Sequence, residues 1–146
     1  MSLTGLWHNE LKSGMLLIED ANNGLTGYYH SFVGRDKGVR KLAGRTHVLD
    51  GSKRMVGFAV CFEIANPGPT SGNTSLCTWS GWYTQRDHPR GIIKTHWHLS
   101  LNELDPKDEW AGNMIGEDWF VKFLDDPRED VIADEAMFRE YVAKNS

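Results

Sequence analysis

The sequence predicts an all-β protein: an eight-stranded antiparallel up-and-down barrel with a short C-terminal helix. Two features of its 146 residues lead to this fold class. Apolar and polar residues alternate with a period of two along most of the chain, as in strands that are buried on one face. The apolar runs are short, and fifteen glycines divide the chain, which indicates many turns.

Eight segments carry the alternating pattern, and short polar segments with turn chemistry separate several of them. These connections include "NNG" at 22–24, "LDGSK" at 49–53, "NPGPTSGN" at 66–73 and "RDHPRG" at 86–91. Strands joined in this way form an antiparallel meander, and eight of them can close around one small ligand. The predicted strands are residues 5–9, 14–19, 24–31, 40–48, 55–64, 75–84, 91–101 and 113–123.

The end of the chain follows a different period. After Pro127 the apolar residues fit one helical stripe, and Asp134 is placed to cap its first turn. We therefore divide the chain into a barrel of residues 1–124 and a helical C-terminal extension of residues 125–146. We expect the stripe to pack on the barrel wall; the alternative is that it covers a pocket mouth in a neighbouring subunit. The stripe consists of Val131, Ile132, Met137, Phe138, Tyr141 and Val142.

Composition limits the classes of partner. The formal net charge is −4, which gives no reason to expect nucleic-acid binding. The apolar runs fall short of the roughly 20 residues that a membrane-spanning helix needs, so no membrane partner is expected. The N-terminus carries no charged-then-apolar signal peptide, and the localisation stays open. Six tryptophans are unusual at this length, and tryptophan dominates packing and ligand sites.

Five motifs occur in order along the chain. They are "LTGLWHNEL" at 3–11, "LTGYYHSFVG" at 25–34, "TWSG" at 78–81, "THW" at 95–97 and "WAGNMIGEDWF" at 110–120. Each is weak alone, but their order and spacing resemble the avidin–streptavidin family of biotin-binding proteins over about residues 3–124. The resemblance implies a non-catalytic protein that binds biotin with high affinity inside the barrel, as a ligand and without any cofactor.

Biotin has a ureido ring that accepts and donates hydrogen bonds, a thioether ring, and a valerate chain that ends in a carboxylate. A buried site must pair each of these polar groups, because unpaired polar atoms in a dry cavity are costly. Asn9, Ser13 and Tyr29 resemble the three family donors that converge on the ureido oxygen. Asp118 and Ser31 resemble the acceptors of the two ureido N–H groups.

The resemblance also implies the apolar lining of the pocket. Trp79 and Trp97 resemble its aromatic walls, with Leu99 and Val33 beside them. Ser75 matches a serine that reaches the valerate carboxylate. Trp110 resembles a tryptophan that one subunit lends to the site of its neighbour, so we expect a homotetramer, with a dimer as the alternative.

Three positions depart from the family pattern. Phe62 stands where a larger aromatic is common, so this wall is smaller. Cys77 replaces a threonine that commonly contacts the ring sulfur, which weakens the hydrogen bond that a hydroxyl would make. Arg35 lies where small polar residues are usual, and it either pairs with the valerate carboxylate or points into water. These departures motivate the alternative function, a barrel of this family that binds biotin weakly or binds a different small ligand.

The segment "IIKTHWHLS" at 92–100 presents two histidines, His96 and His98, two residues apart. Because side chains alternate along a strand and Trp97 is expected to face the pocket, both histidines are expected to point outward. A metal site would need further ligands, and we expect none. The family resemblance instead implies a small subunit contact, in which a histidine and a glutamate would meet across a two-fold axis; the alternative is that both side chains are solvated. This contact consists of His96, Ile115 and Glu117.

Two further expectations follow from the alternation. Cys61 precedes Phe62 and should face outward, whereas Cys77 lies two residues before Trp79 and should face inward, so we expect no disulfide between them. No serine of the inward face is accompanied by a histidine in the arrangement that nucleophilic catalysis requires, so we expect no enzyme.

Overall fold

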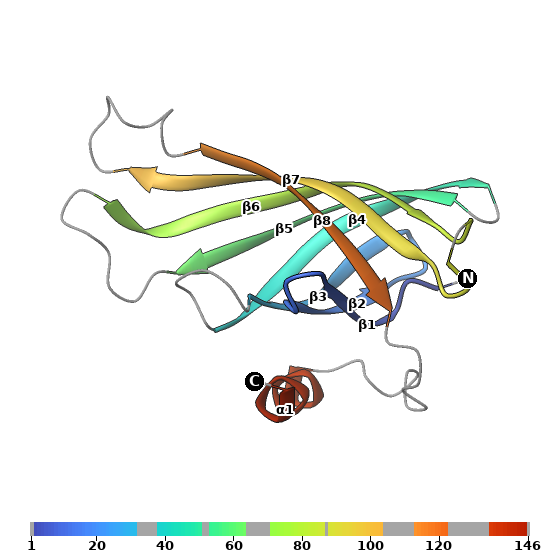
Figure 1. Cartoon of the computed structure of the whole chain (residues 1–146), viewed down its shortest axis with the longest axis horizontal. Coiled ribbons are helices and arrows are strands. Elements are labelled where there is room, and N and C mark those ends of the chain that lie inside the picture. Colours follow the sequence, from blue (N-terminus) through green and yellow to red (C-terminus); the bar gives the residue numbers. More distant parts are fainter. Residues whose placement is uncertain are drawn as a thin grey trace.

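The computed structural model describes residues 2–31, 38–50, 53–63, 71–86, 88–103, 113–122 and 135–145. Within these ranges eight strands form one closed antiparallel barrel, in which each strand pairs with the next and β8 pairs with β1 (Figure 1). This confirms the predicted fold class. The strands are β1 (Gly5–Asn9), β2 (Gly14–Glu19), β3 (Gly24–His30), β4 (Val39–Asp50), β5 (Lys53–Glu63), β6 (Ser71–Thr84), β7 (Ile92–Glu103) and β8 (Asn113–Lys122).

The bounds of β1 and β2 agree with the prediction, and the other strands differ at one or both ends. β3 ends at His30, one residue earlier than predicted. β7 begins at Ile92, because Gly91 has a backbone φ of +87°, which belongs to the preceding turn. A Cβ at Gly91 would lie 2.1 Å from the ring of Tyr83, so this turn also requires the absence of a side chain.

Two hairpins are longer than the turn chemistry predicted. β4 continues to Asp50, which pairs with Lys53 at the start of β5 after a shift of register beyond Val48. β6 begins at Ser71, which pairs with Glu103, and the register shifts before Ser75. In both hairpins, backbone pairing with an adjacent long strand overrides the low strand preference of glycine and polar residues.

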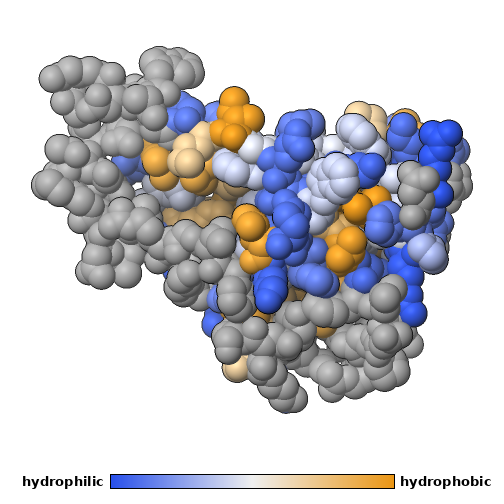
Figure 2. Space-filling model, viewed as in Figure 1, coloured by the Kyte–Doolittle hydropathy of each residue, from blue (hydrophilic) through white to orange (hydrophobic). Residues whose placement is uncertain are grey.

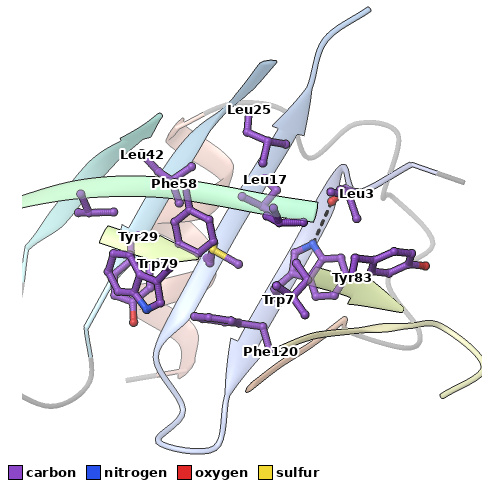
Figure 3. Packing of buried hydrophobic residues seen from close by; sticks show 14 of the residues in the cluster. Leu3, Trp7, Leu17, Leu25, Tyr29, Leu42, Phe58, Trp79, Tyr83 and Phe120 are labelled. Carbon is purple, nitrogen blue, oxygen red and sulfur yellow. Dashed lines mark hydrogen bonds between the residues drawn. The ribbon is translucent and has the colours of Figure 1, made fainter. Parts of the chain in front are cut away.

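The barrel interior holds one continuous hydrophobic core. Trp7 is fully buried in this core, and its indole Nε1–H donates to the carbonyl oxygen of Leu3 at 2.9 Å. The ring of Tyr83 meets Trp7 edge to face, with centroids 6.1 Å apart (Figure 3). Tryptophan and tyrosine can be buried here because their polar ends find partners while their rings fill the barrel. Leu17 and Leu25 complete this part of the core.

A second, smaller hydrophobic cluster lies outside the barrel. The C-terminal helix α1 (Glu135–Asn145) packs beside β3, on the side of the barrel that β1, β2 and β3 form (Figure 1). Phe138 is fully buried against Leu6 and Leu16, and its ring stacks on Tyr28 with centroids 6.4 Å apart. The helix therefore packs on the wall of its own barrel. Val131, Ile132 and the predicted cap Asp134 lie outside the described residues.

The outer face seen in Figure 2 mixes hydrophilic residues with several separate hydrophobic patches. Cys61 is exposed and Cys77 is buried, so the two free thiols lie on opposite sides of the barrel wall, as the alternation predicted. In the part of the chain that the structure describes, no helix combines the length and apolar character that crossing a membrane requires.

Candidate functional site

Buried polar side chains gather inside the barrel near the end where β1, β3, β5 and β7 finish, here called the site end. Asn9 is the last residue of β1, and Ser13 lies just before β2. Asp118 reaches the interior from β8, and all three side chains are buried. The other end of the barrel is filled mainly by apolar side chains such as Leu17 and Ile93, and it also holds the largely buried ion pair of Arg54 and Glu19. The polar group of Asn9, Ser13 and Asp118 therefore lies at one end of the interior, apart from that ion pair.

Asp118 is the centre of this polar group. Its Oδ1 accepts a hydrogen bond from Asn9 Nδ2 at 3.2 Å, and its Oδ2 accepts one from Trp79 Nε1 at 2.8 Å. The hydroxyl of Thr95 donates to the backbone carbonyl of Asp118 at 2.8 Å, which ties β7 to β8 at this position. Two buried donors thus aim at one carboxylate, an arrangement that fixes its orientation.

The pKa of Asp118 is raised to about 6, mainly by burial and to a smaller extent by the nearby Glu10 carboxylate. The hydrogen bonds from Trp79 and Asn9 act in the opposite direction, because they favour the ionised form. The carboxylate is therefore held close to its titration point near neutral pH. It can serve as a charged acceptor at pH 7 and loses that charge in mild acid.

Asn9 and Ser13 are fixed by the turn that joins β1 to β2. Asn9 Oδ1 accepts the backbone N–H groups of Ser13 at 2.9 Å and Leu11 at 3.0 Å. With its oxygen engaged, the amide presents its NH₂ group to the interior. The hydroxyl of Ser13 is hydrogen-bonded to Tyr29. Burial and the negative charge of Asp118 raise the pKa of Tyr29, so its hydroxyl stays protonated. Three donors therefore line one side of the site.

Aromatic rings form the walls around these polar groups. Tyr29 lies against Trp79 with centroids 5.0 Å apart and meets Phe62 edge to face at 5.8 Å. On its other side Trp79 stacks on Phe58 at 5.0 Å with an interplanar angle of 19°. Phe120 meets both Tyr29 and Phe58 edge to face (Figure 3). The rings hold one another in place, so the indole N–H of Trp79 stays directed at Asp118.

Trp97 completes the wall on β7, where it is half-buried between Trp79 on β6 and Gly116 on β8. A Cβ at Gly116 would lie 2.3 Å from the ring of Trp97, so only glycine leaves space for the indole. Leu99 is half-buried beside it. Phe62, Trp97 and Leu99 keep partial solvent exposure at the site end, whereas Leu17 and Ile93 at the other end are fully buried.

Comparison with known proteins identifies the family of this chain. The family model described as the avidin family matches residues 1–123. The chain belongs to the avidin family. Its fold is similar to the crystal structure of Xenavidin, with a TM-score of 0.70 and 23% sequence identity over 84% of this chain and 98% of that chain. Avidin family proteins are non-catalytic and bind biotin as a ligand, not as a cofactor.

With this family in view, most of the predicted site residues converge at the site end. Cys77 is buried next to Leu99 on the neighbouring strand. Burial, and to a smaller extent the negative charge of Asp118, raise the pKa of its thiol to about 12. Ser31 is half-buried just beyond β3. The predicted residues that the structure brings to this end are Asn9, Ser13, Tyr29, Ser31, Phe62, Ser75, Cys77, Trp79, Trp97, Leu99 and Asp118. Val33, Arg35 and Trp110 lie outside the described residues.

The sequence reasoning missed several residues that support the site. Phe58 precedes Phe62 on the same face of β5, so the period-two pattern could have predicted that its side chain also faces the interior. Thr95 lies on the inward face of β7, two residues before Trp97, so the same pattern could have predicted that it is buried. Its pairing with Asp118 on β8 is seen only in the structure. Gly116 and Phe120 are part of the family motif on β8, but the motif alone did not reveal their contacts with the aromatic walls.

His96 and Glu117 form a contact within one chain on the outward faces of β7 and β8. His96 Nε2 lies 3.1 Å from Glu117 Oε1 of the same chain, and both side chains are exposed. Within one chain the two residues are opposite each other in the β7–β8 ladder. The expected contact across a two-fold axis stays a prediction. Among the described residues, no group of three or more His, Cys, Asp or Glu side chains is arranged to hold a metal ion.

Proposed function

We propose that this chain binds biotin with high affinity at the site end of its barrel and performs no reaction on it. The observation that carries the proposal is Asp118, a buried carboxylate that accepts from Asn9 and Trp79 inside a wall of aromatic rings. A carboxylate with this surrounding suits a ligand that donates an N–H group. Burial of Asp118 away from bulk water strengthens such a hydrogen bond.

The other polar groups complement the rest of the ureido ring. The second hydrogen of the Asn9 amide and the hydroxyls of Ser13 and Tyr29 can donate to the ureido oxygen, and Ser31 can accept the second N–H. Trp79 and Trp97 would enclose the bicyclic rings. Ser75, buried on β6, would contact the valerate end, where Val33 and Arg35 are proposed to join it.

Calorimetric titration with biotin tests this proposal. We expect one biotin per chain for the parent and a marked loss of affinity for Asp118→Ala. Lipoic acid is the matched control ligand, because it has a sulfur-containing ring and a valerate chain but no ureido group. We expect it to bind much more weakly than biotin. Equal affinity of the parent for biotin and lipoic acid would contradict the proposed role of the ureido contacts.

One observation favours the alternative, weak binding of biotin or binding of a different ligand. The thiol of Cys77 is buried in the site with a raised pKa, so it stays a neutral, weak donor where a hydroxyl would donate strongly. If the thiol limits affinity, Cys77→Thr should bind biotin more tightly than the parent. An unchanged or weaker affinity in Cys77→Thr would remove this argument for the alternative.

We also propose that the protein assembles as a homotetramer, with a dimer as the alternative. Several large apolar side chains are exposed on the outer face of β5, β6 and β8, away from α1: Met55, Leu76, Trp82, Ile115 and Trp119. Exposed apolar side chains of this number favour burial against another subunit. In such an assembly, Trp110 would reach the site of a neighbour and Ile115, His96 and Glu117 would form a smaller contact.

A further inference from the structure

The turn between β1 and β2 holds β8 from both sides of the barrel wall. From the inner side, Asn9 Nδ2 donates to the Asp118 carboxylate at 3.2 Å. From the outer side, Glu10 Oε2 accepts the backbone N–H of Trp119 at 3.0 Å. Consecutive residues of the turn therefore bind consecutive residues of β8, and they do so at the proposed ligand acceptor.

The Glu10 contact extends the seam that closes the barrel. The ladder of β1 with β8 consists of Trp7, His8 and Asn9 paired with Lys122, Val121 and Phe120. In this register the next pair would be Glu10 with Trp119, but the chain turns away at Glu10. The side chain of Glu10 then supplies the acceptor that a backbone carbonyl would have supplied. One strong hydrogen bond, from an amide to a carboxylate, thus lengthens a short seam beside Asp118.

The turn is rigid enough to transmit this contact. Asn9 N–H donates to the Ser13 carbonyl at 3.1 Å, and Lys12 N–H donates to the Asn9 carbonyl at 3.0 Å. Lys12 has a φ of +66°, a conformation that a residue with a side chain adopts only when its surroundings impose it. Glu10 is therefore presented to β8 by a closed loop of hydrogen bonds that also contains the site residues Asn9 and Ser13.

Glu10 also affects Asp118 through its charge. The groups that face Asp118 are Asn9 and Trp79, which donate to it, and Tyr29 and Cys77, whose raised pKa values keep them neutral. Glu10 contributes a negative charge that raises the pKa of Asp118. On the outer face, the ammonium group of Lys94 lies 4.7 Å from the ring centroid of Trp119, where it faces away from the interior.

We propose that Glu10 is a positioning residue for the ligand site, which fixes β8 at Trp119 and thereby sets the place and charge of Asp118. Glu10 itself does not touch the ligand. The proposal rests on the proposed biotin site, in which Asp118 accepts a ureido N–H. It gives an exposed residue outside the pocket an effect on both the lifetime of the complex and its pH dependence.

Two substitutions separate the hydrogen bond that Glu10 accepts from Trp119 and the negative charge that it places near Asp118. Glu10→Gln removes the charge but keeps an amide oxygen that can accept the Trp119 N–H. Glu10→Ala removes both. We expect Glu10→Ala to release biotin roughly tenfold faster than the parent, the effect of losing one charge-assisted hydrogen bond. Glu10→Gln should release biotin at close to the parental rate at neutral pH.

The effect of the Glu10 charge on the pKa of Asp118 can be measured by NMR without any ligand. The Trp79 indole N–H donates to Asp118, so its NMR signal should move as Asp118 titrates, whereas the Trp7 indole donates to a backbone carbonyl and serves as the internal control. We expect the Trp79 midpoint to move to lower pH in Glu10→Gln and the transition to vanish in Asp118→Asn. Glu140→Gln, an exposed substitution on α1 with the same change in charge, should leave the midpoint in place.

An unmoved Trp79 midpoint in Glu10→Gln, or a parental release rate in Glu10→Ala, would overturn the proposal. The NMR titration needs no biotin. If the parent failed to bind biotin while the Trp79 midpoint still moved, the proposed function would be wrong and the influence of Glu10 on Asp118 would stand.

Discussion

At the scale of single residues, Asp118 links the ligand site to pH. Its pKa in the folded protein is raised to about 6 from the ordinary value of 3.8, mainly by burial. The ionised form therefore costs folding stability above pH 6. That cost shrinks as pH falls through 6 and is gone below the unfolded pKa, so for this group the ligand-free protein gains stability on acidification.

Biotin binding should show the opposite trend with pH. A ligand N–H needs the ionised Asp118 as acceptor, so protonation competes with binding. We expect the dissociation constant to rise by up to about tenfold for each pH unit below about 6. Asp118→Asn should bind more weakly at neutral pH and lose this dependence. Affinities measured across this range for both proteins check the prediction, and a flat profile in the parent would contradict it.

Gly116 gives a second prediction at this scale, because its missing side chain leaves space for Trp97. In Gly116→Ala the new methyl group should displace the indole from the wall, at a cost of about 1–3 kcal/mol. We expect weaker biotin binding and faster release, measured by calorimetry and by displacement with excess ligand. Gly57→Ala is the matched control, since its Cβ would meet no heavy atom closer than 3.7 Å. Equal binding by both variants would remove the role assigned to Gly116.

At the scale of secondary-structure elements, α1 acts as an outer layer behind the site. Phe138 stacks on Tyr28, and Tyr28 precedes the site residue Tyr29 on β3. Phe138→Ala should lower the free energy of unfolding by about 3 kcal/mol, the usual cost of removing a fully buried phenylalanine. The control variant is Arg139→Ala, because Arg139 is the exposed residue that follows Phe138 on α1; it should change the free energy of unfolding little. Denaturant unfolding of the three proteins measures the difference, and equal stability would show that the packing of α1 contributes nothing.

The elements also show what the sequence could predict. Alternation located the eight strands, because one face of each strand meets the core while the other meets solvent. The family resemblance then indicated that Trp79, Trp97 and Asp118 face inward. Alternation did not locate the ends of β4, β6 and β7, where backbone pairing and the positive φ of Gly91 decide. It also left open which wall α1 covers, since an apolar stripe identifies a buried face but not its partner.

The contacts at the site needed the structure for a similar reason. Residue type and motif indicated that Asn9, Ser13 and Tyr29 are donors. The hydrogen bonds that fix Asn9 come from the backbone of its own turn, and Glu10 reaches β8 only because the barrel closes there. Neighbours across the closing seam are more than a hundred residues apart in the chain, so no local pattern records them.

At the scale of the whole molecule, the position of α1 separates two parts of the outer surface. The helix covers the wall of β1 to β3, so the subunit contacts that we propose fall on the wall of β5 to β8 (Figure 1). On that wall Trp82 and Trp119 are 42% and 48% exposed, with Lys53 and Lys94 over their rings. Exposed rings of this size gain more from a subunit partner than from single lysine contacts.

The smaller contact proposed around Ile115 can be tested through the state of assembly. Ile115 is 77% exposed beside the His96–Glu117 pair, whose exposed ion pair adds little stability within one chain. In Ile115→Arg, a tetramer would have to bury unpaired charge where two copies meet, so we expect smaller assemblies by light scattering at matched concentration. Leu49→Arg, on an exposed part of β4, should assemble as the parent does. If Ile115→Arg also assembled as the parent does, this face of β8 would not be a subunit contact, and the exposed tryptophans would be the place to search for the main one.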